Sequence, residues 1–322
     1  MHDLPGDVAN DVFVLAGGAS FGALQVGQLQ ALMEAGVVPD LIIGCSVGAL
    51  NGAAAAGHWS SGNLERIFEV WQDLTTDFVF PGKRAGKIAH IARGHSGVCD
   101  TSGLRQIADW CLEPHQDIAE LPIRCMVITT NFDQGISQAH TSGDATVLVA
   151  SAALPGMFPP VVLDGERHVD GGVLDRVPVA KAAAAGARRI WVLDPSVNTT
   201  HWVPEKATAL DVLISSFNLS THAQSQAGTD AYPNSQVIAL PGPDLGDLRG
   251  HDFSKSRWLM DAGYHLSVPV IATALAEPAP DVSKPAEALR ERGVRRSAAR
   301  LRAQLASRGV RPKRPRKKSP IS

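Results

Sequence analysis

The sequence predicts an α/β fold in which helices pack against a mostly parallel sheet. Residues 11–57 alternate two short apolar runs with two segments of helical pattern, which is the order of a right-handed β-α-β-α unit. Only 5% of the residues are aromatic, while alanine and glycine are frequent, a composition that suits closely packed helices on a sheet better than a β-sandwich. At 322 residues, the chain can bury one large core of this class or two smaller ones.

The individual elements follow from local patterns. The apolar run at 11–18 ends in two glycines and predicts a buried strand, and the run at 40–45 predicts a second one. Between them, residues 23–36 carry leucines at helical spacing and end at Gly36, which predicts a helix, and the small residues at 47–57 predict another. Farther along, we expect helices and loops over 62–112, followed by strands at 121–132 and 145–153. A hairpin should turn at Asp164-Gly165. The last predicted elements are a strand at 188–196, a helix from about Glu205 to Ala227, a strand at 235–242 and a helix at 254–276.

Charge is distributed unevenly along the chain. From Asp281 to Ser322 there are fourteen Lys and Arg residues against three acids, which leaves 16 basic and 29 acidic residues in the preceding part. We therefore expect an N-terminal extension at 1–10, one acidic α/β domain at 11–276, and a proline-punctuated linker with a basic tail at 277–322. The acidic body is not expected to bind nucleic acid specifically, whereas the tail suits a polyanionic surface.

The cysteines and the N-terminus indicate where the protein works. The four cysteines have no paired spacing and are expected to be free thiols in a reducing compartment: Cys45, Cys99, Cys111 and Cys125. The first residues lack the basic and apolar regions of a signal peptide. The sequence has no uninterrupted run of about 20 apolar residues, so we do not expect a membrane-spanning helix. We therefore expect a cytoplasmic protein, and any membrane contact would be peripheral, on the inner face.

Ser46 lies in the pattern Gly44-Cys45-Ser46-Val47-Gly48, between a predicted strand and a predicted helix. This context is what the nucleophile elbow of a serine hydrolase requires. The flanking glycines allow a sharp turn, and the following helix directs its N-terminus at the hydroxyl. The alternative is a tight turn in which Ser46 only caps the helix. The strand–turn–helix context favours the nucleophile.

A glycine-rich loop at 17–22, GGASFG, follows the first predicted strand. Its backbone N–H groups suit a phosphate or the oxyanion of an ester under attack, and the glycines could instead serve only close packing. The dinucleotide pattern fails at Ala19, and the lysine of a P-loop is missing. Because adjacent parallel strands end at the same edge of a sheet, this loop should lie beside Ser46. That placement favours an oxyanion hole.

A serine nucleophile needs a base. Several histidines follow the strands of the body, and none lies in a recognisable local pattern: His201, His222, His251 and His265. Asp170 is more suggestive, because it ends a predicted strand and precedes Gly171 and Gly172, which would let its carboxylate point into the same cleft. The alternative is an ordinary Asp-Gly turn.

Together, GGASFG at 17–22, GCSVG at 44–48 and DGG at 170–172 resemble the three motifs of the patatin-like phospholipase family, in the same order. The stretch ASAALPGMFPPV before Asp170 and VPV after it match as well, so that the resemblance covers roughly residues 11–195. It implies a three-layer α/β/α sandwich with a mostly parallel central sheet. It also implies a lipid acyl hydrolase of the phospholipase A, lysophospholipase or carboxylesterase type.

The resemblance further implies a Ser-Asp dyad that works without histidine, metal or other cofactor. Ser46 would be the nucleophile and Asp170 its proton acceptor, and the enzyme would act through an acyl-enzyme on a lipid or other acyl ester. The remaining motif residues would form or support the oxyanion hole and the turns. These are Gly17, Gly18 and Ala19 for the hole, and Gly22, Gly44, Gly48, Gly171 and Gly172 for support.

The sequence departs from the family pattern in two places. The family loop usually reads GGGx[RK]G, where this chain has Ala19 and Phe21, and Asp175-Arg176 stands where members often carry Asn. Ala19 keeps its N–H but disfavours a positive φ. The altered loop leaves open a non-catalytic lipid-binding or scaffold protein, and the histidines after residue 200 leave open an α/β-hydrolase esterase with a histidine base.

Two flanking segments are candidates for membrane contact. Residues 74–98 mix aromatic, basic and glycine residues and suit either a mobile cap over the cleft or an ordinary surface loop. The basic tail carries apolar residues at helical spacing and suits an anionic membrane surface, and a solvated extension is its alternative.

Overall fold

The computed structural model describes residues 10–81, 96–196, 234–246 and 248–277, together with parts of 205–232. The basic tail and nearly all of the N-terminal extension lie outside the described residues. The same holds for His201, His222, most of the predicted helix at 205–227 and the middle of the 74–98 segment.

A mixed sheet of eight strands forms the centre of the fold, in the order β5-β6-β3-β2-β1-β7-β8, with β4 pairing β3. Five strands are parallel: β3 (Arg124–Asn131), β2 (Leu41–Cys45), β1 (Asp11–Leu15), β7 (Arg189–Leu193) and β8 (Gln236–Ala239). The pairs that involve β4 (Ile136–His140), β5 (Val161–Leu163) and β6 (Glu166–Asp170) are antiparallel. The predicted α/β class with a mostly parallel sheet is confirmed.

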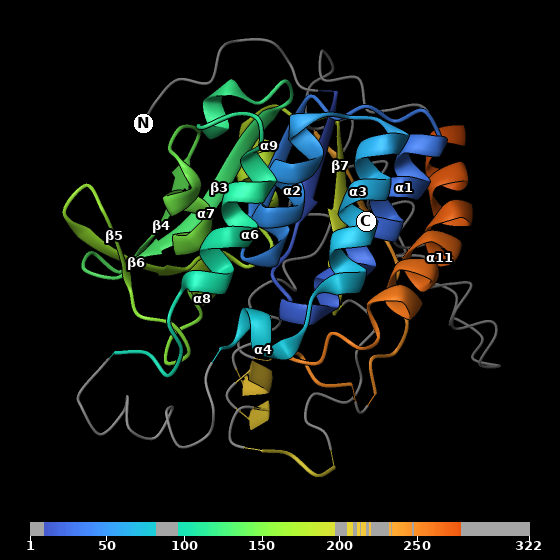
Figure 1. The fold of residues 1–322 in the computed structure, drawn as a ribbon. Coiled ribbons are helices and arrows are strands. Elements are labelled where there is room, and N and C mark those ends of the chain that lie inside the picture. Colours follow the sequence, from blue (N-terminus) through green and yellow to red (C-terminus); the bar gives the residue numbers. More distant parts are fainter. Residues whose placement is uncertain are drawn as a thin grey trace, which may run out of the picture.

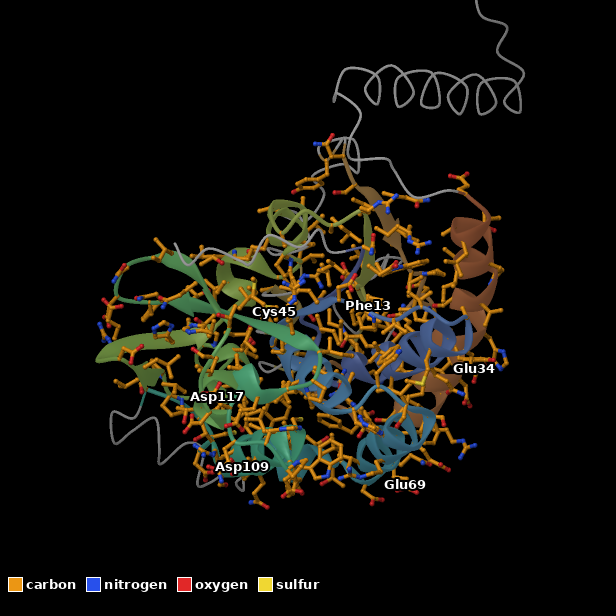
Figure 2. The ribbon with its side chains drawn as sticks, turned by 90° about the horizontal axis from the view of Figure 1, so that it is seen from above. Phe13, Glu34, Cys45, Glu69, Asp109 and Asp117 are labelled. Atoms are coloured by element: carbon orange, nitrogen blue, oxygen red, sulfur yellow. The ribbon has the colours of Figure 1, made fainter. Side chains whose placement is uncertain are left out.

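Helices cover both faces of the sheet, which gives three layers (Figure 1). One face packs against the longer helices: α1 (Ala23–Glu34), α2 (Val47–Gly57), α3 (Ser61–Asp73), α6 (Ser102–Leu112) and α11 (Ser256–Ala276). The other face packs against α9 (Val179–Ala184). Successive residues of β1 serve the two layers alternately, since Phe13 belongs to the first core and Val14 to the second. Figure 2 shows Phe13 and Cys45 near the centre, with Glu34 and Glu69 at the periphery.

The segment predicted as a strand at 145–153 is instead a helix, α7 (Ala145–Ser151). Asp144 caps it by accepting a hydrogen bond from the N–H of Thr146 at 2.8 Å. All of its apolar side chains are buried, so the run has no polar face and no visible period. A short apolar run of this kind has the same pattern in a buried strand and in a buried helix, which explains the wrong prediction.

The other predicted elements that fall on described residues are confirmed in type. The hairpin between β5 and β6 turns at Asp164 and Gly165, whose φ angles of 51° and 85° are those of the mirror-image turns that suit two-residue hairpins. The four cysteines are free and buried. Short helices complete the described fold: η1 (Ala19–Gly22), α4 (Thr76–Val79), η2 (Ile118–Glu120) and α8 (Gly172–Asp175).

Helix α11 is, among the described residues, the one helix long and apolar enough to cross a bilayer by length and composition alone. Its mean hydropathy is 1.2 over the most apolar window, of which 33% is buried. It packs along α1 so closely that Gly27 and Gly263 each lie against backbone atoms of the opposite helix. Core helices of soluble proteins meet the same criteria, so this observation alone does not indicate a membrane span.

Strand β3 sets the position of the two motifs that matter most. Cys45 at the end of β2 lies opposite Ile128 of β3, and Asp170 at the end of β6 lies opposite Thr129. Ser46 and Asp170 therefore meet beside two consecutive residues of one strand, although 124 residues separate them in sequence. The glycine-rich loop follows β1, which pairs in parallel with β2, so all three motifs share one edge of the sheet.

Candidate active site

The hydroxyl of Ser46 donates a hydrogen bond to Oδ2 of Asp170 at 2.6 Å. Ser46 sits at the turn between β2 and α2 with φ 55° and ψ −129°, a backbone conformation that costs a non-glycine residue about 1–3 kcal/mol. The surrounding fold holds it there, and the hydroxyl projects from the turn instead of capping α2. The two residues that the sequence predicted as a dyad are thus in direct contact.

Close backbone packing explains the glycines around Ser46. A side chain at Gly44 would meet the backbone of Gly48 and Ala49, and one at Gly48 would meet the carbonyl group of Leu15 in the neighbouring strand. Helix α2 can therefore pack this closely against the sheet only if both positions are glycine. As a result, the positive end of the α2 dipole begins directly at Ser46, where it favours negative charge on the hydroxyl oxygen.

Asp170 is buried, with 1% of its surface exposed. Its Oδ1 accepts a hydrogen bond from the N–H of Gly172 at 2.8 Å, while Oδ2 accepts the one from Ser46. Burial raises the pKa of Asp170 to about 7, against the opposing effect of these two hydrogen bonds, which favour the carboxylate. A carboxylate with a pKa near neutrality is a far better proton acceptor for a serine than an exposed aspartate.

This pKa predicts how activity depends on pH. If the Asp170 carboxylate accepts the Ser46 proton, kcat/KM should rise with pH and level off above about pH 7, because protonation removes the base. The measurement is kcat/KM for a soluble ester from about pH 5 to about pH 9, repeated at two temperatures. A carboxyl group has a small enthalpy of ionisation, so the midpoint should hardly move. A midpoint that falls clearly on warming would indicate an imidazole base instead.

Ser151, at the C-terminal end of α7, contacts the backbone of Ser46. Its hydroxyl accepts a hydrogen bond from the N–H of Ser46 at 2.9 Å and donates one to the carbonyl of Ile128 at 2.6 Å. This bridge ties the strained turn to β3 and fixes the Ser46 backbone. No local motif predicts this contact of Ser151, and the one signal in the sequence is the place of the residue within the stretch ASAALPG, part of the resemblance described above.

The glycine-rich loop lies beside Ser46, as expected. Gly18 and Ala19 line the pocket next to the serine, and their N–H groups donate no hydrogen bond to any other described residue. Ala19 adopts the positive φ of 51° that its side chain disfavours. For Gly17, the other predicted donor, the N–H points to the carbonyl of Arg176 at 3.4 Å, and the residue does not line the pocket. Within the described part of the chain, the loop N–H groups at the pocket that have no acceptor are those of Gly18 and Ala19.

The supporting glycines fall into two groups. A side chain at Gly22 would collide with Val47, and one at Gly171 with the carbonyl of Ile128 and the sulfur of Cys45. These two residues let the loop and the Asp170 turn approach the elbow. Gly172 acts differently, through the N–H that binds Asp170.

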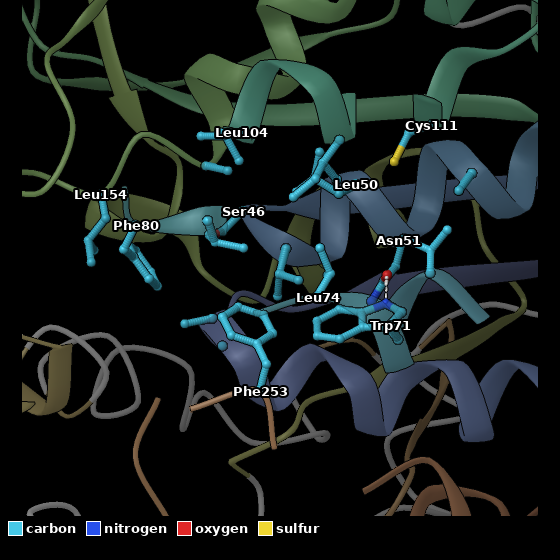
Figure 3. Close-up of a pocket in the computed structure, with 18 of the residues that line it drawn as sticks. Ser46, Leu50, Asn51, Trp71, Leu74, Phe80, Leu104, Cys111, Leu154 and Phe253 are labelled. Carbon is cyan, nitrogen blue, oxygen red and sulfur yellow. Dashed lines mark hydrogen bonds between the residues drawn. The ribbon is translucent and has the colours of Figure 1, made fainter. Parts of the chain in front are cut away.

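A deep apolar pocket opens at the Ser46–Asp170 pair and runs along α2 (Figure 3). Leu50 and Ala54 continue the face of α2 that carries Ser46, so the floor of the pocket extends about 12 Å from the serine, eight residues at a rise of 1.5 Å each. Its walls come from α3, α4, α6, the turn before β5 and the loop before α11. They include Ile67, Trp71, Leu74, Val79, Phe80, Leu104, Ile107, Trp110, Cys111, Leu154, Phe158 and Phe253. Few polar groups interrupt this lining, and the indole N–H of Trp71 is satisfied by Oδ1 of Asn51 at 2.9 Å.

The pocket bears on two of the alternatives from the sequence. A nucleotide site needs polar or basic groups around its phosphates, and this pocket offers an apolar wall instead. No described histidine lines the pocket. Instead His251 lies 3.3 Å from Asp211, and His265 is exposed on α11. The 74–98 segment contributes Leu74, Val79 and Phe80 to the pocket, and its middle lies outside the described residues.

No group of His, Cys, Asp and Glu in the described part of the chain is arranged to hold a metal ion.

Comparison with known proteins agrees with this geometry. The sequence profile of the family described as patatin-like phospholipase matches residues 13–183, a span that contains the glycine-rich loop, the elbow and Asp170. The chain belongs to this family. Among its curated relatives, the lysophospholipase NTE1 of Phaeosphaeria nodorum is 28% identical over 91% of this chain, and the lysophospholipase nte1 of Aspergillus terreus is 32% identical over 56%. This patatin-like chain spans only 20% and 12% of those two proteins.

Among solved structures, VipD from Legionella pneumophila aligns with 83% of this chain and 67% of its own, at 14% sequence identity and a TM-score of 0.44. The family match therefore rests on sequence, and the three layers rest on the structure described above.

Proposed function

We propose that this patatin-like protein is a serine lipid acyl hydrolase that works through a Ser46–Asp170 dyad and an acyl-enzyme. One observation carries the proposal: the Ser46 hydroxyl donates at 2.6 Å to a buried Asp170 carboxylate at the mouth of an apolar pocket. The altered loop does not argue for a non-catalytic protein, since Gly18 and Ala19 still present unoccupied N–H groups beside the serine. A histidine base has no support from any described contact of Ser46.

The reaction follows from this geometry. Asp170 takes the hydroxyl proton as the Ser46 oxygen attacks the acyl carbonyl, and the N–H groups of Gly18 and Ala19 hold the resulting oxyanion. When the tetrahedral intermediate collapses, Asp170 returns the proton to the leaving alcohol and the acyl group stays on Ser46. A water molecule then attacks the acyl-enzyme and loses its proton to Asp170. When this second tetrahedral intermediate collapses, Asp170 returns the proton to the Ser46 oxygen, and the free acid leaves.

The substrate that suits the pocket is an ester with one long acyl chain. The pocket has room for an apolar chain along α2, and the described residues that line it include no cluster of charged side chains for a large head group. The names of the relatives, lysophospholipases, agree with a single-chain lipid. Contact of the basic tail with an anionic membrane surface, from the cytoplasmic side, would bring the enzyme to such substrates and remains a prediction about residues outside the described part.

The function is tested by incubating the full chain with lysophosphatidylcholine and measuring the fatty acid released. In parallel, a fluorophosphonate with an alkyl chain is added, and the modified peptide is located by mass spectrometry. We expect fatty acid release and a covalent label on Ser46. A folded protein that neither releases fatty acid nor takes up the label would favour the non-catalytic alternative.

The length of the pocket predicts a change in chain-length preference on Ala54→Leu. Ala54 lies two turns beyond Ser46 on the same face of α2, so a larger side chain there fills the distal end of the pocket. Each methylene that loses its buried site costs about 0.8 kcal/mol, so kcat/KM for a palmitoyl ester should fall at least about tenfold. The butyryl ester should react as before and serves as the internal control. Equal losses on both esters would contradict the assignment of Ala54 to the distal end.

A further inference from the structure

Arg176 is buried beside the glycine-rich loop, with 1% of its side chain exposed. Its guanidinium makes two parallel hydrogen bonds to Asp194, from Nη1 to Oδ1 at 2.9 Å and from Nη2 to Oδ2 at 2.7 Å. Asp194 directly follows β7 and also accepts hydrogen bonds from the backbone N–H and the hydroxyl of Ser196, both at 2.9 Å. A bidentate ion pair whose carboxylate is fixed in this way holds the guanidinium in one position.

The same arginine binds Gly17 on both sides of its α-carbon. Nη1 donates to the carbonyl oxygen of Gly17 at 3.0 Å, and the backbone carbonyl of Arg176 accepts from the N–H of Gly17 at 3.4 Å. Gly17 is also close to the nucleophile, because a side chain at this position would come within 3.2 Å of Cβ of Ser46. The orientation of the Gly17–Gly18 peptide, at the start of the glycine-rich loop, therefore depends on Arg176.

This contact determines where the next N–H points. Among the described residues the one cis peptide bond is Glu113-Pro114, so the Gly17–Gly18 peptide is trans. In a trans peptide the C=O and N–H groups point in opposite directions. Because the C=O of Gly17 faces Arg176, the N–H of Gly18 faces away from it, and Gly18 lines the pocket beside Ser46. Pro195 limits movement on the other side, since its Cγ lies 3.1 Å from where a Cβ of Gly18 would be.

We propose that Arg176 is a positioning residue of the oxyanion hole. Held by Asp194, it turns the Gly17–Gly18 peptide so that the N–H of Gly18 meets the oxyanion formed when Ser46 attacks. The inference rests on the proposed hydrolase function and adds to it a residue that never touches the substrate. It also explains a role for Arg176, which lies where members of the family often carry Asn. In this chain a cation contacts the loop from outside it, while position 21 within the loop is phenylalanine.

The test separates stabilisation of the transition state from substrate binding. In Arg176→Gln we expect kcat to fall roughly a hundredfold to a thousandfold, the loss that follows removal of one oxyanion donor, with little change in KM. Affinity for an alkyl trifluoromethyl ketone, which adds to the serine and forms an oxyanion, should fall in parallel. Affinity for the matching alkyl alcohol, which fills the pocket without reacting, should stay unchanged. A purely structural role would leave both affinities unchanged or lower them together.

Two further variants keep the proposal testable. The pair of substitutions Arg176→Met and Asp194→Leu removes the guanidinium without leaving a buried carboxylate unpaired, and such replacements often fold well. Arg189→Gln is the matched control, because it breaks the ion pair of Arg189 with Asp11 at 2.9 Å, at the opposite end of the same strand β7. Each variant is checked by thermal unfolding.

The double variant should show the same loss of kcat as Arg176→Gln, and the control should keep its kcat. A folded double variant that keeps kcat and ketone affinity would overturn the proposal. If the parent protein itself hydrolysed none of the esters, that result would count against the hydrolase function. Failure of the Arg176 proposal and failure of the proposed function are therefore distinguishable.

Discussion

Ser46→Ala is expected to lower kcat for ester hydrolysis by a factor on the order of 10⁵–10⁶ while the protein stays folded. The Ser46 oxygen is the atom that would form the acyl-enzyme, so its removal leaves the pocket and the loop donors without a nucleophile. The fold should survive, because the elbow is held by the Ser46 N–H bond to Ser151 and by close glycine packing, and neither needs the hydroxyl. The measurement is turnover of a soluble ester and of lysophosphatidylcholine, with circular dichroism on both proteins.

The control for this prediction is a buried serine away from the site. Ser267 lies on α11, fully buried, and its hydroxyl has no hydrogen-bond partner in the described part of the chain. Ser267→Ala should keep full activity and equal or greater stability, because it removes an unsatisfied buried polar group. If Ser46→Ala retained turnover well above background while Ser267→Ala behaved as expected, Ser46 would not be the nucleophile.

The part of the fold that holds the site could be predicted because its local signals agree with one another. The runs that became β1 and β2 are apolar and end in glycines, and the segment between them has a clear helical period. Parallel pairing of those two strands then places both following loops at one edge. The helix α7 could not be predicted in this way, since a short run buried on all sides carries no period.

The same distinction applies to the site. Ser46 and Asp170 lie in motifs whose glycines are required because the backbone packs closely there. The sequence next to each residue therefore shows that it lies at a tight turn. Ser151, Arg176 and Asp194 act through contacts between residues far apart in sequence, which no local pattern records. The contact between the N–H of Gly17 and the carbonyl of Arg176 is another of this kind. The motifs therefore predicted that Ser46 and Asp170 lie together, and they missed the buried residues that contact the elbow and the loop.

Asp170→Asn is the second change with a large expected effect. The amide cannot accept the Ser46 proton, so kcat should fall by about 10²–10⁴-fold, the usual contribution of a positioned base. Its carbonyl oxygen can still accept from the N–H of Gly172, which preserves the turn. His251→Ala is the comparison that separates the two candidate bases and should keep activity. If His251→Ala abolished turnover and Asp170→Asn did not, the dyad would be wrong.

Relative to the parent, the same variant should become more stable as pH rises, and this provides a readout independent of turnover. Burial raises the pKa of Asp170 to about 7, whereas an aspartate in the unfolded chain titrates near 3.9. Between these two values the native state keeps a proton that the unfolded state has lost, so the stability of the parent falls as pH rises through this range. Asparagine never ionises and does not carry this loss, which amounts to a few kcal/mol at 1.36 kcal/mol for each pKa unit.

We therefore expect Asp170→Asn and the parent to melt together near about pH 4, and the variant to melt several degrees higher near about pH 8. Thermal unfolding at the two pH values checks this, with intact mass measured beforehand because asparagine followed by glycine deamidates readily. An inactive variant with this pH-dependent gain would indicate that the fold keeps a costly buried charge beside Ser46 for the sake of its basicity. Equal melting temperatures at both pH values would mean that Asp170 titrates normally and that its burial does not tune it as a base.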